Sequence, residues 1–531
     1  MDATGIRALL RPEAFPDGVS EPVLVETHIS WVVLTGEIAY KIKKPVAMEF
    51  LDFSTLEARR HYCREEVRLN RRLAPELYLG VVEIRDSADG PVIGGTGADG
   101  PVIEYAVRMR QFDQRRLASR MAAEGRLTPA LCREMGRTIA RFHNGLEPLA
   151  PPADEDSRAP GTPGAIFAAA RQNFEQIDAT LPAREDRSVL RQLEEAAVGD
   201  FERLERRMWH RLEGGYVREC HGDLHLGNIV LADDRVLPFD CIEFNPTFRL
   251  VDIQCEIGFV VMDLESRELP GEANRVLNTW LEHTGDYAGL RLHVFYDVYL
   301  ALVRAKISLF SAVAAAGNGT PDLGDYRRYL ALAAAGRRRL PGFLCLMMGV
   351  SGSGKSTIAE ALAARYSAIR LRSDVERKRL YDLAPSADSA DAGLTERLYS
   401  PATSDRVYAQ LAHLAETVLD AGLPVIVDAT FLEHRRRSVF RELAAQRRLP
   451  FLLVHCIAGE AELERRLTAR RRDSREASEA DVVVMRGQLE SVEPPDEQEV
   501  DSLILVDTEG PDYQRRLEST VERRITAHRR R

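Results

Sequence analysis

The chain has 531 residues, of which 45% are hydrophobic and 29% are charged, and its formal net charge is −10. This length exceeds one ordinary hydrophobic core and predicts two large or about three smaller domains, with enough apolar material for each. The acidic balance argues against a chain that mainly coats nucleic acid. The lack of a secretion signal, and of an apolar run near ~20 residues, predicts a cytoplasmic protein without a membrane segment.

Strand-like segments come first, between about residues 21 and 107, with one helix predicted between residues 55 and 73. From about residue 117 to 335 the pattern is mainly helical. An exception between residues 215 and 251 alternates short apolar runs with polar clusters. After a short basic stretch near residue 340, strands and helices alternate as in a parallel α/β sheet, so we place the main domain boundary there.

A dense polar motif lies within this exception and reads His221-Gly-Asp223-Leu-His225-Leu-Gly-Asn228. Asp223 can accept the proton of an attacking hydroxyl, Asn228 can give Mg²⁺ a neutral oxygen, and Asp240 can give it a charged one. We interpret His221 as a residue hydrogen-bonded within its turn and His225 as a solvated loop residue. The carboxylates and the amide together indicate a phosphoryl-transfer site.

This motif resembles the catalytic loop of the aminoglycoside phosphotransferases and, more distantly, that of the protein kinases. The resemblance covers about residues 20 to 335 and implies a two-lobed kinase-like fold, with a small lobe over 1–112 and a mostly helical large lobe over 113–335. It implies that Asp223 is catalytic and that Asn228 and Asp240 bind metal. The chain departs from the pattern in two places, because it has no glycine-rich loop and because Cys-Ile-Glu243 follows Asp240.

The same resemblance assigns a phosphate-binding lysine to the strand that contains Lys41 and Lys43. Lys41 fits this role best, and Lys43, on the same face of the strand, is the alternative. The implied partner of the lysine is Glu66 in the following helix, with Glu65 as the rival. Asp252 matches the aspartate that braces the catalytic loop in this family.

The segment from Gly349 to Ser356 matches the P-loop pattern GxxxxGK[ST] without a mismatch, between a predicted buried strand and a predicted helix. Its glycines let successive backbone N–H groups face phosphate oxygens, and the helix dipole adds positive potential. We expect Lys355 to reach the β- and γ-phosphates and Ser356 to hold Mg²⁺. The predicted nucleotide-binding residues are Gly349, Val350, Ser351, Gly352, Ser353, Gly354, Lys355, Ser356 and Thr357.

Polar residues after the P-loop are candidates for the transfer step. Asp374 can accept the proton of a substrate hydroxyl while Arg377 holds an anionic group, although Asp374 equally suits a helix start. Asp428 ends a predicted buried strand, where doubly wound sheets present catalytic groups, and we expect it to orient Mg²⁺. Three arginines further on are candidates for a lid, with a solvated helix face as the alternative. They are Arg466, Arg470 and Arg475.

From about residue 343 to 507 the chain resembles the small P-loop kinases, the group of gluconate kinase, polynucleotide kinase and the zeta toxins. Asp374-x-x-Arg377 looks like the DxxR element of the polynucleotide kinase branch, which implies that Asp374 is the general base and Arg377 a ligand of the substrate phosphate. We expect a linker over 336–342 and a P-loop kinase domain over 343–531, in which Lys355 is also catalytic. The complete order is similar to the bifunctional aminoglycoside phosphotransferase/ATP-binding proteins.

We therefore expect a chain of mixed α/β and α+β class that uses ATP and Mg²⁺ to phosphorylate hydroxyl acceptors. The expected acceptor is a small molecule, or else a 5′-hydroxyl end of a nucleic acid. A kinase-like sensor module that controls a single active P-loop kinase is the alternative for the N-terminal half.

Overall fold

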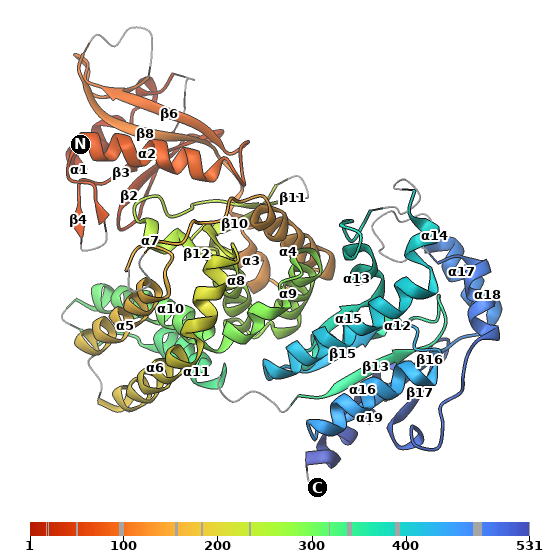
Figure 1. Cartoon of the computed structure of the whole chain (residues 1–531). Coiled ribbons are helices and arrows are strands. Elements are labelled where there is room, and N and C mark those ends of the chain that lie inside the picture. Colours follow the sequence, from red (N-terminus) through yellow and green to blue (C-terminus); the bar gives the residue numbers. More distant parts are fainter. Residues whose placement is uncertain are drawn as a thin grey trace. The chain divides into compact units, whose positions relative to one another are not determined.

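The computed structural model describes all residues except 17–18, 20, 49–50, 95–99, 154–157, 182–183, 233–234, 318, 337–341, 388–392, 471–479 and 530–531. By its internal contacts the chain divides into two compact units. Figure 1 labels most of the helices and strands and colours them along the sequence. The first unit contains Met1–Glu134, Arg141–Asp263 and Leu302–Arg327. The second contains Met135–Ala140, Leu264–Ala301 and Arg328–Arg531.

The first unit opens with helix α1 (Ala3–Leu9) and an antiparallel sheet of six strands in the order β1-β2-β3-β8-β6-β7. These strands are β1 (Val23–Glu26), β2 (Ser30–Leu34), β3 (Ile38–Lys43), β6 (Tyr78–Arg85), β7 (Val92–Ile93) and β8 (Val102–Arg110). A short hairpin of β4 (Ala47–Met48) and β5 (Leu51–Asp52) precedes helix α2 (Leu56–Asn70). The strand-like pattern with one inserted helix is thus confirmed.

Strand β3 separates two small cores because its side chains alternate between the two faces of the sheet. Tyr40 and Ile42 pack into the core that contains helix α1. Ala39 packs on the other face, with apolar residues of helix α2. Lys41 and Lys43 lie two and four residues after Ala39 and therefore on the same face of the strand, so both lysines face helix α2.

Helices dominate the following region, as expected from its pattern. They are α3 (Ala118–Ala123), α4 (Pro129–Asn144), α5 (Pro163–Thr180), α6 (Arg184–Glu213), α7 (Pro246–Arg249), α8 (Ile253–Ser266), α9 (Pro270–Thr284), α10 (His293–Ala316) and α11 (Gly324–Gly336). The non-helical exception contains two antiparallel pairs, β9 (Val217–Glu219) with β12 (Leu250–Asp252) and β10 (Ile229–Ala232) with β11 (Arg235–Pro238). The polar motif forms the loop between β9 and β10.

The second unit is built on a parallel sheet of five strands in the order β14-β15-β13-β16-β17, which confirms the expected P-loop class of fold. Its strands are β13 (Leu344–Met348), β14 (Ile369–Arg372), β15 (Val425–Asp428), β16 (Phe451–Ile457) and β17 (Leu503–Asp507). Its helices are α12 (Lys355–Tyr366), α13 (Ser373–Arg379), α14 (Thr395–Leu398), α15 (Pro401–Asp420), α16 (His434–Gln446), α17 (Glu460–Arg470), α18 (Val482–Glu490) and α19 (Tyr513–Arg529). Helix α9 contacts α12 and β14 within the same unit.

One helical stretch, Tyr287–Ala316, is long and apolar enough to cross a membrane when judged by length and composition alone. The mean hydropathy of its most apolar window is 1.6, and 33% of that window is buried inside the protein. Core helices of soluble proteins meet the same criterion, so the stretch does not by itself indicate a membrane segment.

Candidate active sites

Lysine and carboxylate side chains meet between strand β3 and helix α2. The Nζ atom of Lys41 lies 2.9 Å from Oε1 of Glu66, and that of Lys43 lies 2.8 Å from Oε2. Glu66 is buried, whereas its neighbour Glu65 pairs with Arg68 at the surface of the helix. Both lysines therefore share Glu66, because residues two apart on a strand lie on one face.

The segment after strand β11 brings a second set of carboxylates to the same lysines. Oδ1 of Asp240 lies 2.5 Å from Nζ of Lys41, and Glu243 pairs with Lys43. Asp240 has a left-handed backbone with a φ of 65°, and its N–H donates to the hydroxyl of Tyr78 at 3.0 Å. The aspartate that we expect to bind metal is thus held beside the lysine that we expect to bind phosphate.

Opposite charges balance one another in this buried cluster. Burial alone would raise the pKa of Glu66, but the charges of Lys41 and Lys43 outweigh it and lower that pKa. Burial raises the pKa of Glu243 in spite of its contact with Lys43. Sequence reasoning missed Glu243 as a partner. The sequence contains one indication of this pair: two acids, Asp240 and Glu243, follow strand β11, and two lysines lie on strand β3.

The catalytic loop brings Asp223 and Asn228 together. Nδ2 of Asn228 donates to the backbone oxygen of Asp223 at 3.0 Å and to its Oδ2 at 3.1 Å. Nε2 of His225 lies 3.5 Å from the same Oδ2 and the imidazole is only 14% exposed, so the interpretation of His225 as a solvated residue is wrong. Burial would raise the pKa of Asp223, but His225 and Arg304 lower it overall. The ionised carboxylate can therefore accept a proton.

His221 is fixed inside the turn by its own ring nitrogens. Nε2 lies 2.8 Å from the backbone oxygen of Phe239, and Nδ1 accepts the N–H of Asp223 at 3.3 Å. Burial lowers the pKa of His221, so the ring is neutral. Its proton is on Nε2, because a carbonyl oxygen only accepts. The interpretation of His221 as a hydrogen-bonded turn residue is confirmed.

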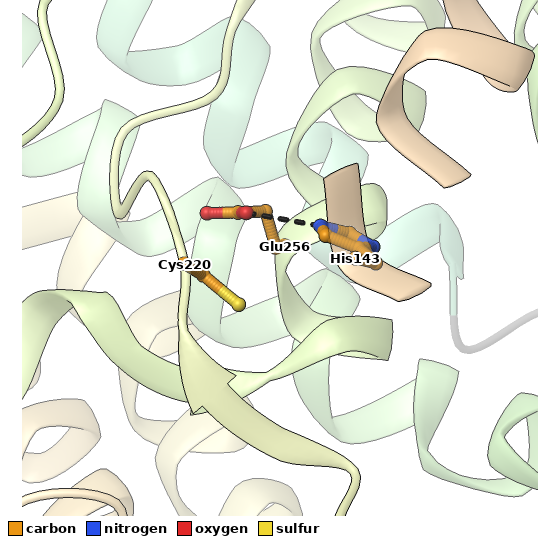
Figure 2. Close-up of side chains that lie close together, drawn as sticks. All are labelled: His143, Cys220 and Glu256. Atoms are coloured by element: carbon orange, nitrogen blue, oxygen red, sulfur yellow. Dashed lines mark hydrogen bonds and ion pairs between the residues drawn. The ribbon is translucent and has the colours of Figure 1, made fainter. Parts of the chain in front are cut away.

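Helix α8 holds the same loop through Glu256 (Figure 2). The Glu256 carboxylate accepts the backbone N–H groups of His221 and of the next residue at 2.8 and 2.7 Å, and lies 3.0 Å from Nε2 of His143. The prediction that Asp252 braces the loop is wrong, because Asp252 pairs with Arg211 at 2.6 Å. Glu256 satisfies loop N–H groups that would otherwise be buried without an acceptor.

His143, Cys220 and Glu256 lie close enough together to suggest a metal site (Figure 2). The donor set does not fit a metal, because Glu256 already accepts hydrogen bonds from the backbone and contacts His143. Burial also raises the pKa of the Cys220 thiol well above its ordinary value. Since Glu256 and His143 contact each other and Glu256 also holds the backbone of the loop, we assign the cluster a structural role.

The P-loop connects strand β13 to helix α12, whose N-cap is Gly354 with a left-handed φ of 88°. Gly349 and Gly352 also have positive φ, at 135° and 86°. A Cβ atom at Gly349 would lie 2.4 Å from the backbone oxygen of Cys456, which is closer than such atoms approach. These positions require glycine, and the curled backbone can present N–H groups to phosphate at the carboxyl end of the sheet.

Buried polar atoms around the P-loop fit a magnesium nucleotide. Nζ of Lys355 donates to the backbone oxygen of Val350 at 2.7 Å. Oγ of Ser353 and Oδ2 of Asp428 are buried and have no hydrogen-bond partner within the part of the chain that the structure describes. Such atoms call for a ligand, and the hydroxyl of Ser356 and the carboxylate of Asp428 are oxygen donors of the kind that Mg²⁺ takes.

Asp374 lies in the first turn of helix α13, directly after strand β14. The register of β14 and β15 places Arg372 opposite Asp428, so Asp374 and Asp428 lie at the same edge of the sheet. Arg377, on the next turn, donates to the backbone oxygen of Leu398 at 2.7 Å. Its guanidinium is therefore directed toward helix α14, where the structure gives it a partner within the protein.

Of the three lid candidates, Arg466 contacts the P-loop. Its Nη1 lies 3.4 Å from the backbone oxygen of Gly352 and donates to the hydroxyl of Thr508 at 2.8 Å. The side chain of Arg470 and the whole of Arg475 lie outside the described residues.

Gln488 on helix α18 is a P-loop contact that sequence reasoning missed. Its Oε1 accepts the backbone N–H of Ser351 at 2.7 Å. No local pattern predicts this contact, because the two residues are far apart along the chain and the contact depends on how α18 packs.

Comparisons with known proteins identify two kinds of domain along the chain. The model of the phosphotransferase enzyme family matches residues 52–293, and an AAA domain model matches residues 344–495. An uncharacterized protein of Mycobacterium tuberculosis is 31% identical over 451 residues, which are 84% of this chain and 85% of that protein.

Solved structures also resemble parts of the chain. A choline/ethanolamine kinase family protein from Mesorhizobium loti has 12% identity and a TM-score of 0.36, over 62% of this chain and 98% of that one. A gluconokinase from Sinorhizobium meliloti has 22% identity and a TM-score of 0.26, over 36% of this chain and 94% of that one. The chain belongs, with its mycobacterial relative, to the family of bifunctional aminoglycoside phosphotransferase/ATP-binding proteins, and it is a kinase-type phosphotransferase.

Proposed function

We propose that this chain uses ATP and Mg²⁺ at two active sites, each of which phosphorylates a hydroxyl acceptor. The P-loop supports the proposal most directly. Left-handed glycines, a buried lysine and the buried oxygens Ser353 Oγ and Asp428 Oδ2 lie together at the carboxyl end of a parallel sheet, and neither oxygen has a hydrogen-bond partner among the described residues. In the proposed division the small lobe covers 1–112, the large lobe 113–335, the linker 336–342 and the P-loop kinase domain 343–531. We place the protein in the cytoplasm.

In the kinase-like site, Asp223 takes the proton of the acceptor hydroxyl as its oxygen bonds to the γ-phosphorus of ATP, while the bond from that phosphorus to the bridging oxygen breaks and ADP leaves. Its lowered pKa keeps it ionised at neutral pH, and the hydrogen bond from Asn228 fixes its orientation. Asn228 and Asp240 would hold Mg²⁺, which neutralises phosphate charge when bound. Lys41, positioned by Glu66, would hold the nucleotide phosphates.

In the P-loop site, backbone N–H groups from Gly349 onward and the ammonium of Lys355 bind the phosphates. Ser356 and Asp428 would hold or orient Mg²⁺ there. Asp374 accepts the proton of the second acceptor, and Arg466, already in contact with the loop, stabilises the charge of the transferred group. Arg377 serves the acceptor side of the same site.

A sensor role for the kinase-like half is the second candidate. The observation in its favour is that Lys41 pairs directly with Asp240, and Lys43 with Glu243, so that phosphate- and metal-binding groups neutralise each other. A nucleotide with Mg²⁺ has to open these pairs before it binds. Calorimetry on residues 1–335 separates the candidates, since failure to bind Mg²⁺-ATP favours the sensor role.

The two-site proposal is tested by phosphate transfer from labelled ATP with the full chain and three variants. We expect Lys355→Ala and Asp374→Asn to lower transfer by the P-loop half, and Asp223→Asn to lower transfer by the other half, each by about a hundredfold or more. Asp382→Asn, at an exposed position, is the matched control and leaves both rates unchanged. Unaltered turnover in all three variants would rule the proposal out.

The acceptor class is tested with each half in turn. Sugars, aminoglycosides and 5′-hydroxyl oligonucleotides are compared as acceptors of labelled phosphate. We expect a small hydroxyl compound to accept phosphate, because the net charge of −10 is unfavourable for a nucleic acid. Transfer to the oligonucleotide alone would replace this expectation by 5′-end kinase activity.

A further inference from the structure

Strand β14 is at an edge of the parallel sheet, and helix α9 contacts it. The side-chain amide of Asn278 accepts the N–H of Arg370 at 2.6 Å and donates to the backbone oxygen of Ala368 at 3.0 Å. Asn274 donates to the same oxygen at 3.0 Å. These amides take the place of a neighbouring strand, so α9 is fixed against the strand that leads directly to Asp374.

Glu282, one turn further along α9, extends this contact to two arginines of β14. Its Oε1 lies 2.7 Å from Nη2 of Arg370, and its Oε2 lies 3.4 Å from Nη1 of Arg372. The Glu282 side chain is only 6% exposed. Burial would raise its pKa, but Arg370 and Arg372 lower that pKa overall, so Glu282 carries its charge.

Arg372 lies between this glutamate and the carboxylate at the end of the next strand. The register of the two strands places it directly opposite Asp428, with Nε 3.9 Å from Oδ2. At that distance the guanidinium attracts the carboxylate without a hydrogen bond to it. Oδ2 of Asp428 has no hydrogen-bond partner among the residues that the structure describes, so it is available to another ligand.

We infer that Glu282 is a positioning residue of the P-loop site, which holds Arg372 away from Asp428 and thereby leaves Asp428 available to orient Mg²⁺. This inference rests on the proposed nucleotide function of the P-loop and adds a residue that precedes the predicted P-loop domain. Without Glu282, Arg372 keeps its charge and has Asp428 within reach. A bonded Arg372–Asp428 pair competes with Mg²⁺ for the same carboxylate.

The test measures ATP affinity of the full chain by calorimetry, once with Mg²⁺ and once with EDTA. The binding component that disappears in Lys355→Ala reports the P-loop site. For Glu282→Gln we expect this component to lose about five- to tenfold in affinity for Mg²⁺-ATP, with metal-free ATP affinity changed less than about twofold. A merely structural role would weaken both affinities alike.

Two further variants assign the effect to Arg372. In Arg372→Met no guanidinium is left beside Asp428, so the loss of Glu282 should have no further effect. We therefore expect Arg372→Met and the double variant Glu282→Gln/Arg372→Met to bind Mg²⁺-ATP with equal affinity. The matched control is Glu360→Gln, which removes one charge 3.8 Å from Arg370 and should leave the Mg²⁺ dependence unchanged.

Three outcomes overturn the inference: equal loss with and without Mg²⁺, no loss in Glu282→Gln, or a loss that the added Arg372→Met does not restore. If Glu282→Gln fails to fold, the comparison of Arg372→Met with wild type decides, since the inference requires at least wild-type affinity for Mg²⁺-ATP. If Lys355→Ala removes no binding component, the proposed P-loop function fails rather than the positioning role of Glu282.

Discussion

Glu66 is the residue on which the kinase-like charge cluster depends, because one buried carboxylate faces two lysines. Replacing it by Gln keeps the shape but leaves Lys41 and Lys43 with less opposite charge away from water. We expect Glu66→Gln to lower the free energy of unfolding by about 3 kcal/mol. The matched control is Glu65→Gln, which breaks a surface pair with Arg68 and should change it by less than about 1 kcal/mol. Urea denaturation of both variants measures these changes. Equal changes in the free energy of unfolding would contradict the assignment of Glu66 as the carboxylate on which the cluster depends.

The contribution of Glu66 to the free energy of unfolding should also depend on pH. Lys41 and Lys43 outweigh the effect of burial and hold the folded-state pKa of Glu66 below its ordinary value of 4.5. A lowered pKa means that the stabilisation is complete above that ordinary value and is lost as the pH falls through the folded-state pKa. We therefore expect the stability difference between wild type and Glu66→Gln to be constant from about pH 7 to 5 and to shrink below pH 4.5. A difference that grows on acidification would contradict this.

At the scale of elements, the P-loop turn depends on backbone space rather than on side chains. Gly349 has a φ of 135°, and an added Cβ would meet a backbone oxygen at 2.4 Å, so Gly349→Ala has to shift the loop. We expect this variant to lower the affinity for Mg²⁺-ATP by about tenfold or more. Gly487→Ala is the matched control, because that glycine lies within helix α18 and has open space around it. It should leave nucleotide affinity unchanged and raise helix stability slightly.

Sequence reasoning worked where the chemistry of an element is contained in a short segment. The P-loop and the loop around Asp223 were recognisable because each concentrates its residues within one turn between two elements. The bracing acid was assigned wrongly for the opposite reason. Asp252 and Glu256 are both acids near the start of helix α8, and sequence spacing does not tell which one faces the N–H groups of His221. Packing decides this, and it selects Glu256.

Over the whole molecule, the order of strand-like and helical segments was enough to predict the fold class. It was not enough to predict which residues belong to each compact unit. Residues 264–301 lie with the parallel sheet in the second unit, although their helical pattern continues that of the preceding region. Asn274, Asn278 and Glu282 carry this contact. Their polar character on a helix predicts a solvated face when the sequence alone is considered. The predicted boundaries at 335 and 342 therefore need a test that measures stability.

A fragment of residues 343–531 provides that test, because it contains all five strands of the sheet but lacks helix α9. The N–H of Arg370 and the oxygen of Ala368 then lose Asn278, and Arg370 loses Glu282, at an exposed strand edge. We expect the fragment to be about 2 to 4 kcal/mol less stable than the same sheet in the full chain, and to self-associate as its concentration rises. Asn278→Ala in the full chain isolates the edge contribution and should cost about 1 to 3 kcal/mol. A monomeric fragment that unfolds at the urea midpoint of the full chain would show that residues 343–531 form a complete domain, whose stability does not depend on α9.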